Sequence, residues 1–153
     1  SLDALDGEFL GSDRTSWSEA SRSLAERGIV PTDSIARIHL VERFGQLIGN
    51  TDRHFGNLSF YLDGTKVTGL APIYDMLPMH YAPRGGELQS SIHPFPLPSP
   101  AWGDVAEEAI DLADIFWRRV RDSAGVDEGL HSAAGESIQE LQRVHAAFTH
   151  LPQ

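Results

Sequence analysis

The sequence contains no cysteine. Disulfide bonds, cysteine nucleophiles and zinc sites built from thiolates are therefore excluded. A chain without cysteine suits a reducing compartment, and we expect a cytoplasmic location.

The sequence also lacks any apolar run long enough to cross a membrane. Its first residues carry neither the basic charge nor the apolar stretch of a signal peptide, so we expect no membrane partner. A length of 153 residues supports one hydrophobic core and is short for two. We therefore predict a single domain over residues 1–153.

Positive charge is scarce, and Lys66 is the only lysine among 12 basic residues. The formal net charge of -10 disfavours nucleic acid as a direct partner, because phosphate contacts need clustered cations. Arg118, Arg119 and Arg121 do cluster, but they fall at the end of a predicted helix, where cations favour the helix dipole. We interpret them as a solvated helix end.

Helical periodicity dominates the rest of the chain. Ser16 and Glu19 have capping-box spacing and Gly28 supplies a stop, so a helix is predicted over about 17–27, with residues 1–14 before it as a loop. Apolar residues on one face predict a second helix from about 32–34 to Gly49-Asn50. Two further helices are predicted over about 105–120 and 130–148.

The period changes in the middle of the chain. Leu58, Phe60 and Leu62 alternate with polar positions, and Asp63-Gly64 turns the chain into a second strand over 66–71. Residues 78–100 are too rich in proline, glycine and serine for regular structure. The predicted fold class is mainly α: helices around a small β-hairpin, with a long proline-rich loop.

A polar cluster lies between the second helix and the hairpin. Asp52 precedes Asn57 by five positions, the offset between base and metal-binding Asn in protein kinases, and Asp75 follows the hairpin where kinases place their second metal-binding Asp. Carboxylate and amide oxygens suit Mg²⁺, which neutralises phosphate charge during transfer. The pattern predicts Asp52 as the residue that orients the attacking hydroxyl, with Asn57 and Asp75 as cation ligands.

Each of these residues also has a structural interpretation. Asp52 can cap a turn, Asn57 can enter a strand as an Asx residue, and Asp75 can be a helix N-cap. His54 either bonds the loop backbone or touches a phosphate as a catalytic group.

The segment Asp52-Arg53-His54, with Asn57, resembles the catalytic loop of phosphatidylinositol-type and other atypical kinases. Together with residues 47–51 and 70–76, it is more closely similar to the C-terminal domain of the HipA family of serine/threonine kinase toxins. The resemblance covers most of the chain and is strongest over 35–79. The proline-rich region 81–102 resembles the YjjJ branch of that family.

The resemblance implies the C-terminal, helical lobe of a bilobed kinase. Asp52 would then be the base, with Asn57 and Asp75 on Mg²⁺, ATP as the phosphate donor, and a protein serine or threonine as the acceptor. It implies toxin–antitoxin biology and persistence. The implied partners are an antitoxin, a target such as an aminoacyl-tRNA synthetase, and the protein's own N-terminal lobe.

Two departures from the family pattern matter. Gly56 stands where many HipA-like loops carry lysine, which removes a cation next to Asn57. No glycine-rich phosphate loop or strand lysine precedes Asp52, although kinases need both there. We therefore expect this chain to be part of a longer protein, without the lobe that grips ATP and inactive by itself.

Two other functions remain open from the residues alone. Asp52, His54, Asn57 and His80 are also suited to surround a cation and activate water in a metal-dependent nuclease or phosphoesterase. Alternatively, the lobe is a non-catalytic binding module for an antitoxin or target. For the kinase lobe, we also expect exposed apolar surface where the other lobe would dock.

Overall fold

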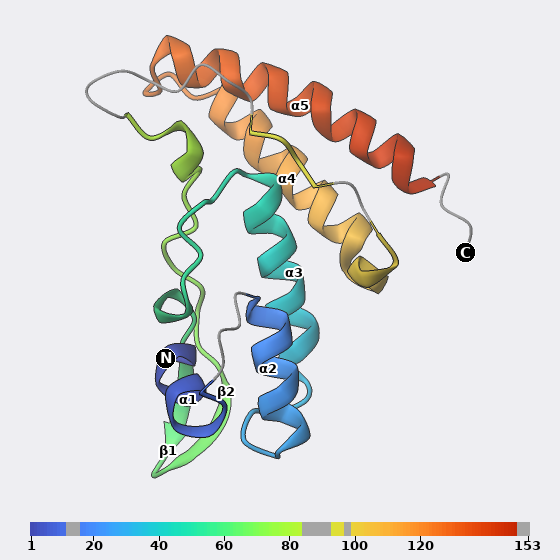
Figure 1. Cartoon of the computed structure of the whole chain (residues 1–153). Coiled ribbons are helices and arrows are strands. Elements are labelled where there is room, and N and C mark those ends of the chain that lie inside the picture. Colours follow the sequence, from blue (N-terminus) through green and yellow to red (C-terminus); the bar gives the residue numbers. More distant parts are fainter. Residues whose placement is uncertain (12–15, 84–92, 97–98, 150–153) are drawn as a thin grey trace. The chain divides into compact units, whose positions relative to one another are not determined.

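The computed structural model describes residues 1–11, 16–83, 93–96 and 99–149 (Figure 1). The predicted mainly α fold with one small hairpin is confirmed. In chain order the elements are α1 (Leu2–Phe9), α2 (Trp17–Glu26), α3 (Ser34–Leu47), the 3-10 helix η1 (Phe55–Asn57), β1 (Phe60–Asp63), β2 (Lys66–Leu70), the 3-10 helices η2 (Met79–Tyr81) and η3 (Pro100–Val105), α4 (Ala106–Arg121) and α5 (Glu128–Thr149). Much of the predicted proline-rich loop, residues 84–92 and 97–98, lies outside the described residues.

The chain divides into two compact units, and the division falls inside α3. The first unit comprises residues 1–42 and 52–76, and the second comprises residues 43–51 and 77–153. All four predicted site residues therefore belong to the first unit. The single domain over 1–153 stays a prediction.

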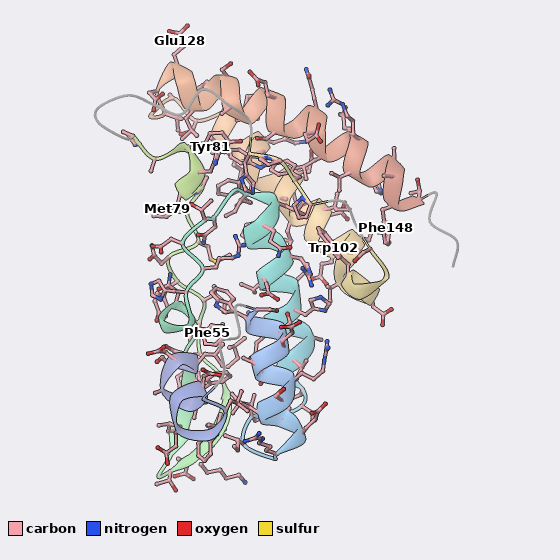
Figure 2. The ribbon with its side chains drawn as sticks, viewed as in Figure 1. Phe55, Met79, Tyr81, Trp102, Glu128 and Phe148 are labelled. Carbon is pink, nitrogen blue, oxygen red and sulfur yellow. The ribbon has the colours of Figure 1, made fainter. Side chains whose placement is uncertain are left out.

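The first unit is built on a core to which α1, α2, α3 and the segment just after η1 contribute. Its fully buried members are apolar: Leu2, Trp17, Ala20, Leu24, Val30, Ile38 and Leu58. Phe55, labelled in Figure 2, packs against this core from η1. The candidate loop is thus attached to buried structure through an aromatic side chain at its centre.

The N-terminal segment corrects a prediction. We expected a loop over residues 1–14, but Leu2–Phe9 form α1, whose N-cap Ser1 accepts a hydrogen bond from the Ala4 N–H at 3.4 Å. Leu2 is fully buried, and its N–H donates to the Leu58 carbonyl at 2.7 Å. An eight-residue helix is marginal in isolation, so tertiary packing of Leu2 decides this helix where local propensity does not.

The N-terminus of α2 is held by a buried carboxylate on α3. Glu42 is 5% exposed and accepts hydrogen bonds from the Ser16 hydroxyl at 3.1 Å, the Trp17 N–H at 2.8 Å and the Ser18 N–H at 3.2 Å. The Ser18 hydroxyl donates to the same carboxylate. Backbone donors at a helix start need such acceptors, and a negative charge there also favours the helix dipole.

The hairpin has the predicted antiparallel pairing. Phe60 faces Leu70 and Asp63 faces Lys66, with the turn at Gly64, whose φ is +59°. The register shifts between Tyr61, which faces Gly69, and Leu62, which faces Val67. Thr68 is therefore an extra residue on β2, a β-bulge.

The second unit packs α4 against α5 around a buried tryptophan. Trp117 is fully buried and donates from Nε1 to the Leu47 carbonyl at 3.0 Å, so it closes the C-terminal end of α3. Tyr81 on η2, labelled in Figure 2, packs edge-on against Trp117 with ring centroids 5.5 Å apart. Its hydroxyl lies 3.3 Å from that of Ser137 on α5.

Gly49, just after α3, has a φ of +70°, and neighbouring side chains crowd its Cβ position. A Cβ there would lie 3.3 Å from Tyr81 Cε2 and 3.4 Å from the Cβ atoms of His80 and His93. Gly49→Ala should therefore lower the free energy of unfolding by about 1–3 kcal/mol, since a left-handed backbone and a crowded site both oppose it. Urea denaturation measures this value.

Gly64→Ala is the matched control for that substitution. Gly64 has a similar φ, but no atom lies within 4 Å of its Cβ position. The loss of unfolding free energy in Gly64→Ala should therefore reflect only the left-handed backbone conformation. If the two variants lose equal stability, the close approach of Tyr81, His80 and His93 to Gly49 carries no energetic weight.

Two arginines of the C-terminal cluster on α4 form ion pairs with neighbouring carboxylates. Arg118 bonds Asp114 at 2.5 Å, and Arg121 bonds Asp122 at 2.8 Å. The hydrogen bond from Arg121 holds the pKa of the Asp122 carboxyl below its ordinary value. The cluster is thus a solvated helix end, as interpreted from the sequence.

Among the described residues, no helix is long and apolar enough to cross a membrane.

Candidate functional site

The candidate loop of the first unit is folded back on itself by its own amide side chain. Asn57 Nδ2 donates to the Asp52 carbonyl at 2.9 Å, which closes the five-residue interval between the two predicted site residues. The Asn57 N–H donates to the His54 carbonyl at 3.1 Å within η1. The structure thus brings Asp52 and Asn57 together through the loop backbone.

The hydrogen bond from Asn57 Nδ2 fixes the orientation of the amide, whereas it leaves the Asp52 carboxylate at the surface. A backbone carbonyl only accepts hydrogen bonds, so the Asn57 nitrogen must face Asp52, and the amide oxygen is the atom left to meet a cation or another donor. Asn57 is 5% exposed, whereas Asp52 is exposed to solvent. The loop therefore presents an accessible carboxylate beside a fixed, buried amide.

His54 has a structural bond in this loop. It is the N-cap of η1, and its Nδ1 accepts from the Gly56 N–H at 3.1 Å. An accepting Nδ1 places the proton of the neutral ring on Nε2. The ring is exposed. The backbone-bonding interpretation is thus observed, while a catalytic role for His54 stays a prediction.

A tryptophan that sequence reasoning used only as a helix start also holds the loop. Trp17 Nε1 donates to the His54 carbonyl at 3.2 Å, and the indole is buried in the core. The Glu42 carboxylate binds the N–H of the same Trp17. A continuous set of hydrogen bonds therefore connects α3, the start of α2 and the candidate loop.

The segment that carries Asp75 is tied to the loop by its neighbour Tyr74. The Tyr74 hydroxyl donates to the Gly56 carbonyl at 2.6 Å and lies 3.3 Å from the Ser59 hydroxyl. The side chain of Tyr74, the residue before Asp75, therefore contacts the turn that precedes Asn57. Sequence reasoning placed Tyr74 only in the motif and gave its hydroxyl no role.

Asp75 has an unusual backbone conformation. Its φ is +57°, and it is the only non-glycine residue with positive φ in the described part of the chain. Asp and Asn tolerate this region better than other side chains, though at some cost. The next helix, η2, begins only at Met79, so Asp75 is not an N-cap. Strained residues of this kind gather at functional sites, which makes Asp75 the strongest backbone signal in this unit.

The donor chemistry fits Mg²⁺. Asp75 offers an exposed carboxylate and Asn57 an amide oxygen, both hard ligands, and Mg²⁺ commonly takes only one or two protein ligands besides phosphates and water. Within the described ranges, no group of three or more His, Cys, Asp or Glu residues is arranged to hold a metal ion. That finding concerns all-protein sites and does not bear on a two-ligand site with an amide.

Tyr74→Phe should loosen the contact between the two parts of the site without disturbing the core, because Tyr74 is 45% exposed. We expect a loss of about 1 kcal/mol in unfolding free energy at most. Backbone amide exchange should rise at residues 54–57 and 73–76. Tyr61→Phe, an exposed tyrosine on β1, is the control. Unchanged exchange in both segments would show that the Tyr74 hydroxyl does not hold them together.

The fold and this loop define a known class of domain. Residues 18–147 match the HipA-like C-terminal domain, and the chain belongs to that family. The chain is 36% identical over 145 residues to Toxin YjjJ of Escherichia coli strain K12, which supports the YjjJ branch. The match covers 94% of this chain but 32% of that relative. No solved structure matches the chain.

Proposed function

We propose that this chain is the catalytic lobe of an ATP- and Mg²⁺-dependent protein serine/threonine kinase of the HipA type, inactive without the lobe that grips ATP. The observation that carries the proposal is the closed loop of Asp52 and Asn57, with the strained Asp75 tied beside it through Tyr74. Family membership supports it, because the whole loop lies within the matched residues.

Asp52 has a different role in phosphate transfer from Asn57 and Asp75. Exposed Asp52 accepts a hydrogen bond from the serine or threonine hydroxyl and aims its oxygen at the γ-phosphorus of ATP. The hydroxyl oxygen forms the new bond to the γ-phosphorus as its proton passes to the Asp52 carboxylate. The bond from the γ-phosphorus to the oxygen that bridges to the β-phosphate breaks, and ADP leaves with that oxygen. Asn57 and Asp75 would hold Mg²⁺, which neutralises phosphate charge when bound. Pre-set geometry is the protein's main contribution.

The Asn57 bond to Asp52 has a direct mechanistic use. It fixes the amide that would meet the cation relative to the backbone of the residue that orients the hydroxyl. Trp17 and Tyr74 hold the same loop from two further sides. Donors and acceptors held in place before the reaction need no reorganisation during it, which is the basis of electrostatic catalysis.

The test is phosphate transfer from labelled ATP by the full-length parent protein, with and without Mg²⁺, beside the 153-residue chain. Transfer by the parent that EDTA abolishes, and none by the chain alone, is the expected result. Normal transfer by the chain alone would contradict its dependence on another lobe. No transfer from a folded parent with candidate protein substrates would favour the binding module.

The biological role follows as part of the same proposal. One relative is named a toxin, and we propose that the parent protein of this chain acts as the toxin of a toxin–antitoxin pair, with an antitoxin and a protein substrate as partners. An aminoacyl-tRNA synthetase is the candidate substrate to assay first. Growth arrest on expression of the parent protein, relieved by Asp52→Ala, would support this role.

The nuclease or phosphoesterase hypothesis has a separate test. Its residues Asp52, His54 and Asn57 lie in the first unit and His80 in the second. Nucleic-acid cleavage by the purified chain that EDTA abolishes and Asp52→Ala removes would establish it. We do not favour it, because the acidic net charge of -10 opposes a nucleic-acid substrate.

A further inference from the structure

The first unit has a groove away from the predicted site residues. It has a volume of about 450 Å³ and lies between β2 and the turn that joins α2 to α3. Figure 1 shows β2 as the strand of the hairpin nearer to that turn. The main lining residues are Ile29, Val30, Pro31, Lys66, Val67 and Thr68. The volume is in the range of ligand sites, and the wall on the turn side is apolar.

The strand that borders this groove has one unused edge. In the part of the chain that the structure describes, the sheet has two strands, so β2 pairs with β1 on one side only. Among the described residues, Lys66, Val67 and Thr68 make no backbone hydrogen bond beyond that pairing. Thr68 is also the bulge residue and has no partner facing it on β1. A free edge beside an apolar wall is suited to an added extended segment.

The groove also has a charge preference. Lys66 is its one charged lining residue, and it makes no ion pair with any other residue in the described part of the chain. Asp63 faces it across the hairpin by register, without a salt bridge. Within the groove, this ammonium beside apolar side chains favours one carboxylate on the incoming segment, whereas the net charge of -10 opposes a segment that carries many.

We propose that this groove docks an extended segment of a protein partner, which adds along the free edge of β2, places an apolar side chain against Ile29 and Pro31, and sets an acidic residue against Lys66. Main-chain bonds to the strand edge supply affinity that is independent of sequence, and the apolar wall with Lys66 supplies the selection.

The groove is connected to the candidate site through short pieces of chain. β1 begins at Phe60, three positions after Asn57, and β2 ends at Leu70, five positions before Asp75. A segment bound along β2 would therefore restrain the hairpin that separates the two parts of the site. The residues proposed for docking differ from those proposed for phosphate transfer, so one proposal can be disproved while the other holds.

The experiment titrates the 153-residue chain with three fluorescein-labelled nonapeptides at up to millimolar concentration, followed by anisotropy and by backbone amide chemical shifts. All three alternate valine with threonine and differ only at the central residue, which is glutamate, glutamine or lysine. We expect the glutamate peptide to bind tightest and to shift residues 28–32 and 66–68. Lys66→Glu should weaken it about fivefold or more, the size of one exposed or partly buried charge contact.

The controls separate this proposal from its alternatives. Arg22→Glu makes the same charge change on α2 outside the lining residues and should leave binding unchanged. Asp52→Ala should also bind normally, so that a failed kinase assay does not affect the result. Failure of all three peptides, tightest binding of the lysine peptide, or shifts at other residues would overturn the proposal. A concentration-dependent dimer with shifts at 66–68 would overturn it in favour of a second copy of the chain.

Discussion

Asp52→Ala in the full-length parent protein should lower phosphate transfer about 10²- to 10³-fold, the usual loss for one well-placed catalytic or charge-stabilising group. Asp52 is exposed, and its contact with Asn57 uses the backbone carbonyl, which alanine retains. The fold should therefore persist, and the loss should fall on the rate. Initial rates with labelled ATP and a protein substrate measure it.

Asp75→Asn should cause a loss of similar size for a different reason. Asparagine tolerates a φ of +57° and keeps the shape of the side chain, so only the negative charge is removed. The variant should need more Mg²⁺ for half-maximal transfer, whereas Asp52→Ala should not. Asp75→Gly serves as the backbone control: it should gain up to about 1 kcal/mol in stability while transfer is lost.

The two variants are informative because they have different expected signatures. An equal Mg²⁺ requirement in wild type and Asp75→Asn would show that Asp75 does not hold the cation. Full transfer by Asp52→Ala would remove Asp52 from its assigned role, even if Asp75 retained its own.

Glu42→Gln should lower the free energy of unfolding by about 2–3 kcal/mol, because it removes charge from a buried carboxylate that accepts four hydrogen bonds at the start of α2. The amide has one oxygen for the same four donors, and its nitrogen would face hydrogen-bond donors. Urea denaturation of the 153-residue chain measures the loss.

This substitution should also reach the candidate loop. Trp17 donates its N–H to Glu42 and its indole N–H to the His54 carbonyl, so a looser α2 start should raise amide exchange at residues 54–57. Glu26→Gln, the same charge change at the exposed end of α2, is the control and should cost less than about 0.5 kcal/mol. Equal effects from the two variants would show that the buried carboxylate has no special role.

Much of the fold was predictable because its patterns are local. The helix over 17–26 follows from the capping-box spacing of Ser16 and Glu19, and Ser16 does accept from the Glu19 N–H at 3.3 Å. The hairpin follows from alternation around Asp63-Gly64. α1 was not predictable, because it depends on burial of Leu2 and on its bond to Leu58, which is distant in sequence.

The candidate site likewise has features that the sequence predicts and features that only the tertiary structure shows. The spacing from Asp52 to Asn57 and the place of Asp75 are properties of the sequence, and they led to the loop. The positive φ of Asp75, the reach of Tyr74 to Gly56 and the hold of Trp17 on His54 are tertiary facts without a local pattern. Their roles in catalysis remain predictions, and the assays above decide them.

Gly56 leaves room for the ring that caps η1. A Cβ at this position would lie 2.8 Å from His54 Nδ1 and Cε1, in the space that the ring needs to cap η1. A lysine at position 56 is therefore incompatible with this placement of the imidazole. The two positions should be epistatic: Gly56→Lys should displace the ring and cost at most the hydrogen bond of the His54 cap, about 1 kcal/mol, and it should be nearly neutral after His54→Ala.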